Sequence, residues 1–406
     1  MQDDCITVAL GMPEVRVEGW RQEGETLVVT VRYRCMSRPC PGCKRQTSHV
    51  HQYHRQNKGH VPLWGRAVVL ELRKRLFRCG GCRRVFMEPD ELCGWRRRST
   101  RAFRSALADG CRAATVKAVA ARAGVSEALV QRAFSEMASG LTEPVAGAAR
   151  VLALDELWIG ARGGYLTLLY GIEERRVLAL EPGRCQASAE TVLMSQGEGI
   201  PVQAVVIDMT ECFRQAVRYA CPGAAIVADK FHVLARVLAD LGRVVSRVQA
   251  EATGQDARTL RRRRLFTAPT PSLSVAERAE RDRLRAVYPD LDEAWRMAEA
   301  FREIYGAASR EEARKRLETW WAQVQQHGPR EFRGLRYMLT HWREEILNYF
   351  TYHATNGFAE GKNNRIKAII RAGYGYRNLT NLTQRIMLDN PHTHVAGEAY
   401  SPHFLT

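Results

Sequence analysis

The sequence lacks any apolar stretch that approaches the roughly 18 consecutive residues of a membrane span. It begins with the acidic tetrapeptide Met1-Gln2-Asp3-Asp4, and no apolar core of a secretory signal peptide follows. There is also no internal repeat and no collagen-like tract. These absences exclude membrane-spanning and fibrous proteins and predict a cytosolic protein. In that reducing compartment, the 11 cysteines indicate free thiols and metal ligands, and they argue against disulfides.

The composition of the sequence predicts a folded protein with a basic net charge. Its 406 residues are 45% hydrophobic, which is enough for a substantial core and too much for a disordered chain. The length predicts about two to four domains. The net charge is +17, and residues 1–150 hold 26 Lys and Arg against 14 Asp and Glu. A positive excess concentrated in one third of the chain indicates a polyanionic partner, most simply nucleic acid, and so a protein associated with the nucleoid.

Four cysteines form two C-x2-C pairs: Cys40 with Cys43, and Cys79 with Cys82. Two intervening residues let both sulfurs of a pair face one ion, and the glycines within the pairs fit tight turns. Four thiolates form a closed tetrahedral site, which is the pattern of structural zinc. A strand expected at Ala67–Leu72, between the pairs, fits a zinc ribbon. Four neighbouring histidines could substitute as ligands, although such residues more often lie on the surface or contact phosphate: His49, His51, His54 and His60.

Residues 116–134 fit two helices joined by a tight turn. Ala120 is small where the helices would cross, Gly124 permits the turn, and Ser126 can cap the second helix. This pattern predicts a helix-turn-helix, with a plain helical hairpin as the alternative. The residues expected to contact DNA are Glu127, Gln131 and Arg132 on the second helix, with Arg96, Arg97 and Arg98 upstream.

Residues 151–232 alternate short apolar strands with helical segments, which is an α/β layout. The expected strands are Val151–Leu154, Tyr165–Ile172, Val177–Leu180, Ala204–Ile207 and Ala225–Ala228. Residues 233 to about 350 are helical in composition and dense in charge, with an exposed loop expected at 268–272.

Two aspartates end the first and fourth of these apolar runs. Asp155 follows Leu154, and Asp208 follows Ile207, so each is expected at a sheet edge. Glu156 is the alternative to Asp155, because only one of two neighbours on a strand faces a given side. Asp229 competes as a second ligand, or else it is a helix N-cap.

A third carboxylate, Glu360, lies far downstream within a basic helical segment. Lys367 follows it by seven residues, nearly two helical turns, so the two side chains should share a face. Asn363, Asn364 and Arg371 are expected to extend that face. Two strand-end aspartates and a glutamate can together hold two magnesium ions that clamp a phosphodiester. Singly, each carboxylate is more often an ordinary polar residue, so the prediction depends on the combination.

These features together resemble the DDE transposases of bacterial insertion sequences, most closely the IS-L-three family. The matching motifs are LDELW, VIDM, ADKFHV and NGFAEGKNNRIKAIIRAGYGYRN, in addition to the ribbon and the helix pair. The resemblance implies an RNase H-like α/β core with a mixed sheet and a helical insertion, and it implies Asp155, Asp208 and Glu360 as the catalytic triad. It further implies N-terminal modules that bind terminal inverted repeats, strand cleavage and transfer into target DNA, and a homodimer on double-stranded DNA.

The domain prediction follows from these motifs. It comprises a zinc ribbon at 1–95, a helix-turn-helix at 96–145, the first part of the core at 146–234, the insertion at 235–350, and the last part of the core at 351–406. The gap between Asp208 and Glu360 is too long for one loop and therefore requires an inserted domain. Two rival functions remain open: a non-catalytic DNA-binding regulator derived from a transposase, and a nuclease that cuts without joining.

Overall fold

The computed structural model describes residues 9–94, 96–139, 151–160, 163–196, 202–373, 375–376 and 378–390. These residues form two compact units. The first unit contains the described residues up to 139 and those between 372 and 389, and the second contains those between 151 and 371 together with Asn390. Within the described ranges, no helix combines the length and apolar composition needed to cross a membrane.

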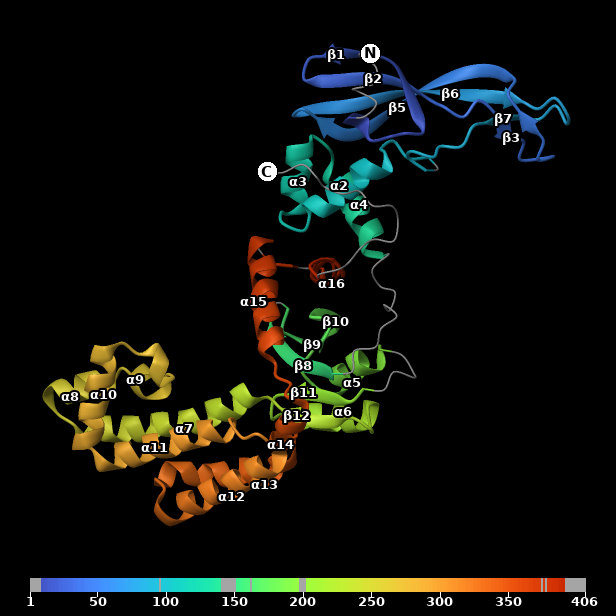
Figure 1. Cartoon of the computed structure of the whole chain (residues 1–406). Helices are drawn as coiled ribbons and strands as arrows, with labels where there is room; N and C mark the ends of the chain where they lie inside the picture. The colour runs from blue at the N-terminus through green and yellow to red at the C-terminus, as the bar shows by residue number, and fades with distance from the viewer. Residues whose placement is uncertain are drawn as a thin grey trace. The chain divides into compact units, whose positions relative to one another are not determined.

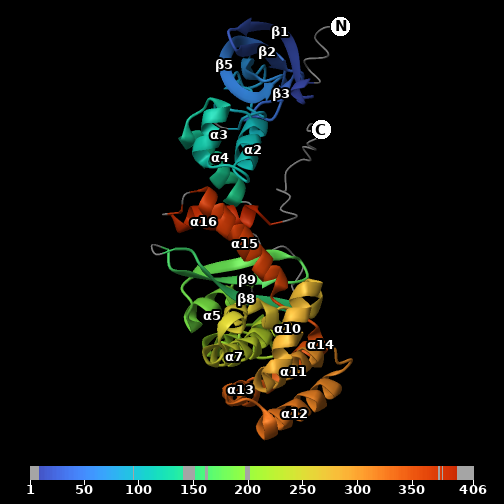
Figure 2. The ribbon, with the colours of Figure 1, turned by 90° about the vertical axis from the view of Figure 1, so that its left-hand side faces the viewer.

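The first unit begins with a five-stranded sheet that curls around an apolar core (Figures 1 and 2). Its strands are β1 (Val15–Glu23), β2 (Thr26–Tyr33), β5 (Val50–Leu63), β6 (Arg66–Arg78) and β7 (Val85–Met87). They are ordered β1-β2-β6-β5, with β7 beside β6, and β2 and β6 pair in parallel. The strand predicted at Ala67–Leu72 is confirmed as part of β6. The short strands β3 (Arg38–Pro39) and β4 (Gln46–Thr47) flank the first cysteine pair.

A helical bundle follows the sheet in the first unit. It contains α2 (Arg101–Gly110), α3 (Val116–Ala123), α4 (Glu127–Ser139) and the C-terminal α16 (Leu379–Leu388). The two helices predicted at 116–134 are present as α3 and α4. Gly124 ends α3 in the left-handed conformation with φ 64°, and the Ser126 hydroxyl accepts from the Leu129 N–H at 3.3 Å. Phe103, Val130 and Phe134 are buried together in the core of this bundle, and Leu388 of α16 joins them.

The second unit is organised around a mixed five-stranded sheet. Its strands are β8 (Val151–Trp158), β9 (Tyr165–Gly171), β10 (Arg176–Pro182), β11 (Ala204–Ile207) and β12 (Ala225–Ala228). The order is β10-β9-β8-β11-β12; the pairs among the first three are antiparallel, and β11 is parallel to both β8 and β12. All five predicted strands are therefore confirmed. Leu152 and Leu154 belong to the same apolar cluster as residues of α5 (Gln186–Met194) and α6 (Glu211–Ala220).

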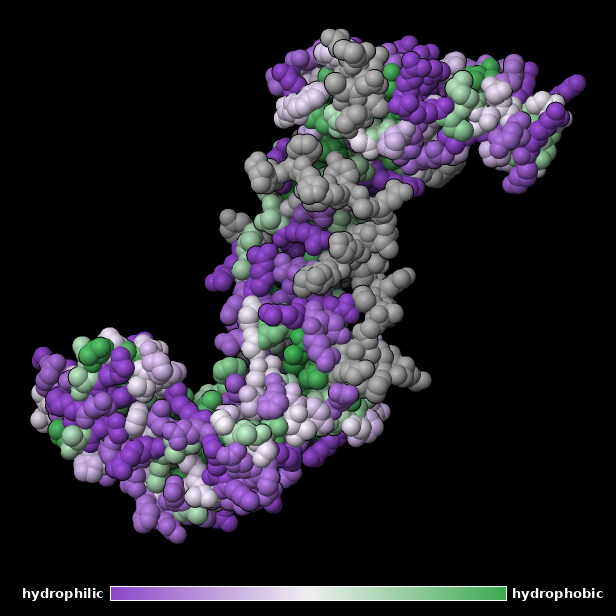
Figure 3. Space-filling model, viewed as in Figure 1, coloured by the Kyte–Doolittle hydropathy of each residue, from purple (hydrophilic) through white to green (hydrophobic). Residues whose placement is uncertain are grey.

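The helical insertion begins at the end of β12. Its elements are α7 (Lys230–Glu251), α8 (Gly254–Leu260), α9 (Arg264–Thr267), η1 (Thr270–Ser272), α10 (Val275–Val287), α11 (Pro289–Ile304), α12 (Arg310–His327), η2 (Arg330–Gly334), α13 (Leu335–His341) and α14 (Arg343–Tyr352). The apolar core of the sheet continues into this insertion without a break, through Leu241, Phe301 and Trp320. The insertion surface displayed in Figure 3 is mainly hydrophilic, as its charged sequence predicts.

The chain then returns to the sheet as α15 (Gly357–Ala372), which lies across β8 and β9 (Figure 2). Because side chains alternate along β8, Leu154 faces the apolar core with α5 and α6, whereas Asp155 faces α15. The predicted last part of the core, 351–406, is divided between the two units, since α15 belongs almost wholly to the second and α16 to the first. Residues 391–406 lie outside the described residues.

Candidate active site and metal centre

The four predicted zinc ligands meet in one place. The sulfur atoms of Cys40, Cys43, Cys79 and Cys82 all lie within 4.8 Å of one another. The Sγ–Sγ distance is 3.5 Å both for Cys40–Cys82 and for Cys43–Cys79. A tetrahedral site with Zn–S bonds of about 2.3 Å requires sulfurs roughly 3.8 Å apart, so the cluster is close to the size that zinc needs.

The two cysteine pairs have the same backbone turn. The Lys44 N–H donates to the Cys40 carbonyl, and the Arg83 N–H donates to the Cys79 carbonyl, both at 2.9 Å. Lys44 and Arg83 have positive φ values of 63° and 61°. The backbone N–H groups of Cys82 and Gly81 lower the pKa of the Cys79 thiol to about 6, which favours the thiolate that binds metal. The arrangement is that of a preformed four-thiolate site.

The structure also brings together the two predicted aspartates. β8 and β11 pair in parallel with Val206 opposite Ala153, so Asp208 follows β11 beside Asp155 of β8. The expectation that Asp155 ends its strand was wrong: β8 continues to Trp158. The reason is that β8 pairs with β11 only over its first residues, whereas its pairing with β9 continues to the end of the strand.

The environment of Asp155 disfavours a lone negative charge. Burial, with the charge of Asp208 as the second cause, raises the pKa of the Asp155 carboxyl to about 7. Asp155 accepts hydrogen bonds from the backbone N–H of Glu156 at 2.8 Å and from Asn363 Nδ2 at 2.7 Å. Two adjacent carboxylates of this kind can share a divalent cation, which would remove their mutual repulsion.

A second acidic residue and a histidine complete a compact cluster around Asp208. Ligand atoms of Asp208, Asp229 and His232 lie within 4.8 Å of one another. His232 Nδ1 pairs with Asp208 Oδ1, and this hydrogen bond raises the pKa of the histidine. Asp229 is buried and caps α7, accepting from the His232 N–H at 3.3 Å. The helix-cap interpretation of Asp229 is therefore confirmed, and its position near Asp208 leaves its role as a metal ligand a prediction.

Two asparagines contact these carboxylates, one within α15 and one immediately before it. Asn363 donates to Asp155 and accepts from the buried Tyr170 hydroxyl at 2.6 Å. The Asn356 N–H donates to Asp229 Oδ1 at 2.9 Å, and Asn356 Nδ2 lies 3.5 Å from Asp208 Oδ1. Asn363 was expected on the exposed basic face; it is instead buried against the sheet.

Glu360 lies on α15 between these two asparagines. It follows Asn356 by four residues and precedes Asn363 by three, so it is near the same edge of the helix. Its side chain is exposed and is not part of the acidic cluster found among the described residues. Lys367 and Arg371 are exposed on the same side of α15, as predicted from their spacing.

The structure separates Glu156 from the cluster. Glu156 is the neighbour of Asp155 on β8, so its side chain points to the opposite side of the strand. There it forms an ion pair with Arg184 at 3.7 Å. The preference for Asp155 over Glu156 agrees with this geometry.

One orphaned acceptor tests whether a metal ion fits the carboxylate site. Asn356 Oδ1 is buried and has no hydrogen-bond partner among the described residues. It belongs to the same side chain whose Nδ2 approaches Asp208. Carboxylate and amide oxygens are the ligands that magnesium prefers. The excess of buried carboxylates and the unsatisfied oxygen therefore fit a hard divalent cation.

The predicted DNA-contacting residues of the first unit differ in exposure. Glu127 and Arg132 are exposed on α4. Gln131 is half-buried, and its amide donates to Asn381 of α16 at 3.3 Å. Arg96 and Arg98 are also exposed, whereas Arg97 is partly buried and pairs with Glu136 of α4 at 2.5 Å.

The sequence analysis missed the supporting residues Asn356 and Tyr170. A signal for Asn356 was present, because positions i−4 and i+3 from Glu360 lie on one side of a helix. No comparable signal marked Tyr170, whose contact with Asn363 joins segments 193 residues apart.

Comparisons with known proteins agree with these features. A family model of ISL3 (IS-L-three) type, described as a transposase, matches residues 152–386, which include Asp155, Asp208 and Glu360. A second model, described as a zinc-finger of transposase IS204/IS1001/IS1096/IS1165, matches residues 37–84, which include all four cysteines of the cluster. The chain is 26% identical over 378 residues to the transposase for insertion sequence element IS1001 of Bordetella parapertussis, covering 89% of this chain and 91% of that protein.

Proposed function

Because the chain belongs to the ISL3 transposase family, we propose that it binds the terminal inverted repeats of an insertion sequence and cleaves and rejoins DNA strands at the carboxylate site. The observation that carries this proposal is the convergence of Asp155, Asp208 and α15 on one sheet edge. The zinc-ribbon match and the four-cysteine cluster support zinc in the first unit.

We assign the core of the second unit to the RNase H-like fold. When the five strands are numbered by their order in the chain, their spatial order across the sheet is 3-2-1-4-5. Neighbours among the first three strands are antiparallel, and the fourth strand is parallel to both the first and the fifth. The first four segments predicted from the sequence are retained as functional parts of this proposal, and of the last segment only α15 is assigned to the core. The 96–145 segment is a helix-turn-helix whose α4 reads DNA, and the 235–350 segment is an insertion that separates Asp208 from Glu360.

Asp155, Asp208 and Glu360 are proposed to hold two magnesium ions. When bound, these ions supply activation of the attacking oxygen and stabilisation of the leaving oxygen. Asn363 fixes the orientation of Asp155 through its 2.7 Å hydrogen bond, and His232 holds Asp208. Glu360 differs from the aspartates in being exposed on α15, so it is the ligand that DNA and metal would draw inward.

Positive residues near the carboxylates would hold the DNA strand. Lys367 and Arg371 extend from Glu360 along the exposed side of α15, and both can contact phosphates. Lys230 begins α7 two residues before His232, on the same turn of helix. We infer that the functional form is a homodimer on double-stranded DNA, in which two element ends are processed together.

The test is cleavage of a duplex carrying the element's terminal repeat, with magnesium present. We expect Asp155→Asn to lower strand cleavage by at least about 10³-fold, because it removes one ligand and the charge that faces the ion. Binding of the duplex, measured by fluorescence anisotropy, should be nearly unchanged. Glu156→Gln is the matched control, since its side chain points away from the site, and it should retain cleavage.

Three outcomes would contradict parts of this proposal. Wild-type cleavage by Asp155→Asn would remove Asp155 from the site. Duplex binding without any cleavage by the unmodified protein would favour a DNA-binding regulator. Cleavage without joining of the released ends to target DNA would favour a nuclease.

A further inference from the structure

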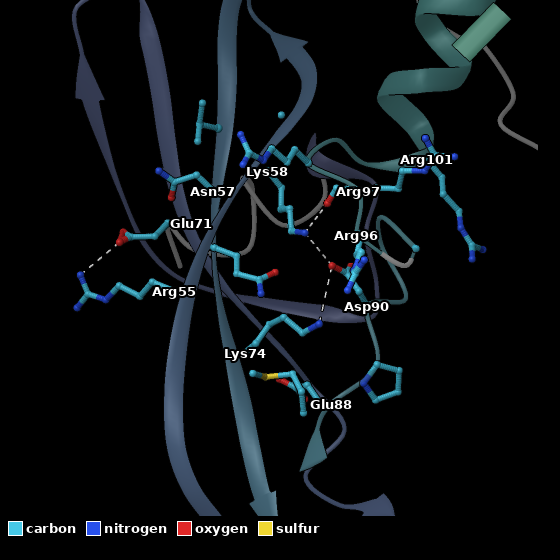
Figure 4. Close-up of a pocket in the computed structure, with 17 residues that line it drawn as sticks. Arg55, Asn57, Lys58, Glu71, Lys74, Glu88, Asp90, Arg96, Arg97 and Arg101 are labelled. Atoms are coloured by element: carbon cyan, nitrogen blue, oxygen red, sulfur yellow. Dashed lines mark hydrogen bonds and ion pairs between the residues drawn. The ribbon is translucent and has the colours of Figure 1, made fainter. Parts of the chain in front are cut away.

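A large cleft opens on the sheet of the first unit. It lies between β5, β6 and the residues of 87–94 and 96–101, and its volume is about 1520 Å³ (Figure 4). Sites for small molecules usually measure roughly 300–1,000 Å³. The size of this cleft is therefore suited to a stretch of a polymer.

The lining of the cleft is strongly basic. Seven Arg and Lys side chains and three Asp and Glu side chains line it. All three acids are paired within the protein: Glu88 with the buried Arg75 at 2.7 Å, Asp90 with Lys58 at 2.9 Å, and Glu71 with Arg55 at 3.3 Å. The remaining excess of positive charge favours an anionic ligand.

Lys74 places one of these positive charges at a defined point in the cleft. Its side chain is 6% exposed, and its ammonium lies 3.9 Å from Asp90 Oδ2, the oxygen that already pairs with Lys58. Among the described residues, Lys74 Nζ has no partner within hydrogen-bond distance. Burial lowers the pKa of Lys74. An ammonium carries three N–H donors, so an anionic oxygen in the cleft can accept from Lys74 beside its long ion pair with Asp90.

The arginine run at the rim of the cleft is fixed to the sheet. The Gly59 N–H donates to the Arg98 carbonyl, and the Thr100 N–H donates to the Gly59 carbonyl, both at 2.9 Å. The Phe103 ring of α2 packs beside Gly59, where a Cβ atom would lie in van der Waals contact with it at 3.4 Å. Arg98 and Arg101 are consequently held at the cleft with their side chains exposed.

The same rim is joined to α4. Arg97 pairs with Glu136 of α4 at 2.5 Å, and Arg104 pairs with the same carboxylate at 3.3 Å. The cleft and the exposed side of α4 therefore belong to one surface of the first unit. A duplex held by α4 has its sugar-phosphate backbone within reach of a neighbouring basic surface.

We propose that this cleft is a second DNA-binding site, which holds the sugar-phosphate backbone of the duplex contacted by α4 through Lys74, Arg98 and Arg101. This inference rests on the proposed function. It adds a contact that is independent of base sequence, and it assigns a ligand to a buried lysine that the helices do not use.

The experiment compares Lys74→Met and Arg98→Ala with Arg16→Ala in the full-length chain. Arg16 is an exposed arginine on β1 and does not line the cleft. Affinity for a terminal-repeat duplex and for a random duplex of equal length is measured by anisotropy across salt concentrations. Loss of one phosphate contact should reduce the salt slope by about 0.9, which corresponds to roughly 8-fold weaker binding at 0.1 M salt. We expect this loss for both duplexes in both cleft variants and not in Arg16→Ala.

Several results would overturn the proposal. The proposal fails if the cleft variants bind both duplexes as tightly as Arg16→Ala does. It also fails if they lose affinity for the terminal-repeat duplex alone. Tighter binding of a single-stranded RNA of the same length, weakened by the same substitutions, would assign the cleft to RNA. Thermal melts identify a misfolded Lys74→Met, in which case the exposed Arg98→Ala carries the test. If the cleft variants bind DNA normally and the unmodified chain cleaves it, only the role of the cleft in DNA binding is refuted. If the unmodified chain neither binds nor cleaves DNA, the proposed function itself is refuted.

Discussion

The cysteine cluster of the first unit and the carboxylate cluster of the second differ in how their ligands are supplied and how completely they are paired. All four cysteines come from residues 40–82, and their sulfurs already lie within 4.8 Å of one another. The proposed magnesium ligands come from residues 155–360, and only Asp208 belongs to the compact acidic group found among the described residues. The four cysteines already meet in one place, whereas two of the three proposed magnesium ligands, Asp155 and Glu360, lie outside the compact acidic group.

This difference is the one expected between a structural metal site and a catalytic one. A structural zinc site is closed by four protein ligands, while a catalytic metal site keeps positions for water and substrate. The raised pKa of Asp155 and the orphaned Asn356 Oδ1 are unfavourable features that a folded protein retains where function requires them. The contrast therefore predicts that disrupting the cysteine site affects folding, and disrupting the carboxylate site affects activity.

The largest expected effect is loss of the cysteine site. Replacing Cys40 and Cys43 with serine should abolish stoichiometric zinc binding, measured by elemental analysis, and should unfold the region around the ribbon. The free energy at stake is on the order of 10 kcal/mol, because zinc binding and local folding are coupled. Cys35→Ser is the matched control, since Cys35 is an exposed cysteine outside the cluster. Unchanged zinc content in the double variant would show that the ribbon does not hold the metal.

The next largest effect is expected at the carboxylate site, from substitution of Glu360. Glu360→Gln should lower magnesium-dependent cleavage by about 10³-fold, or roughly 4 kcal/mol, without altering the melting temperature. The exposed position of Glu360 accounts for the unchanged stability. Asp229→Asn provides the comparison, because Asp229 is the acid that lies nearest Asp208 in the compact cluster. Wild-type cleavage by Glu360→Gln together with loss in Asp229→Asn would move the third ligand from α15 to the start of α7.

The local signals of the sequence predicted much of the fold. The C-x2-C pairs, the apolar runs of the mixed sheet, and Gly124 with Ser126 all act within a few residues, so they can be recognised without tertiary information. β5 was not predicted, because His, Gln, Asn and Lys dominate its sequence and its apolar pattern is weak. The extension of β8 beyond Asp155 was also not predictable, since it depends on pairing with β9.

The carboxylate site was less predictable than the strands that carry it. The positions of Asp155 and Asp208 followed from local sequence, but the support for them did not. Whether Asn363 faces solvent or the sheet depends on how α15 packs, and the basic residues around it favoured the wrong side. Gln131 is a similar case, because its contact with Asn381 depends on α16, which is 250 residues away in sequence.

The smallest expected effect tests the support of Asp155 by a distant side chain, whereas in the cysteine site the Cys79 thiol is supported by backbone N–H groups of its own turn. Asn363→Ala removes the donor to Asp155 and leaves the buried Tyr170 hydroxyl without its acceptor. We expect a loss of about 1–3 kcal/mol in the free energy of unfolding. We also expect roughly 10–100-fold slower cleavage, with a higher magnesium concentration for half-maximal rate, because Asp155 is no longer oriented. Asn364→Ala, at the exposed neighbouring position, is the control and should change neither quantity. A variant that loses stability while its magnesium requirement stays the same would limit Asn363 to packing, and Asp155 would then owe its orientation to β8 alone.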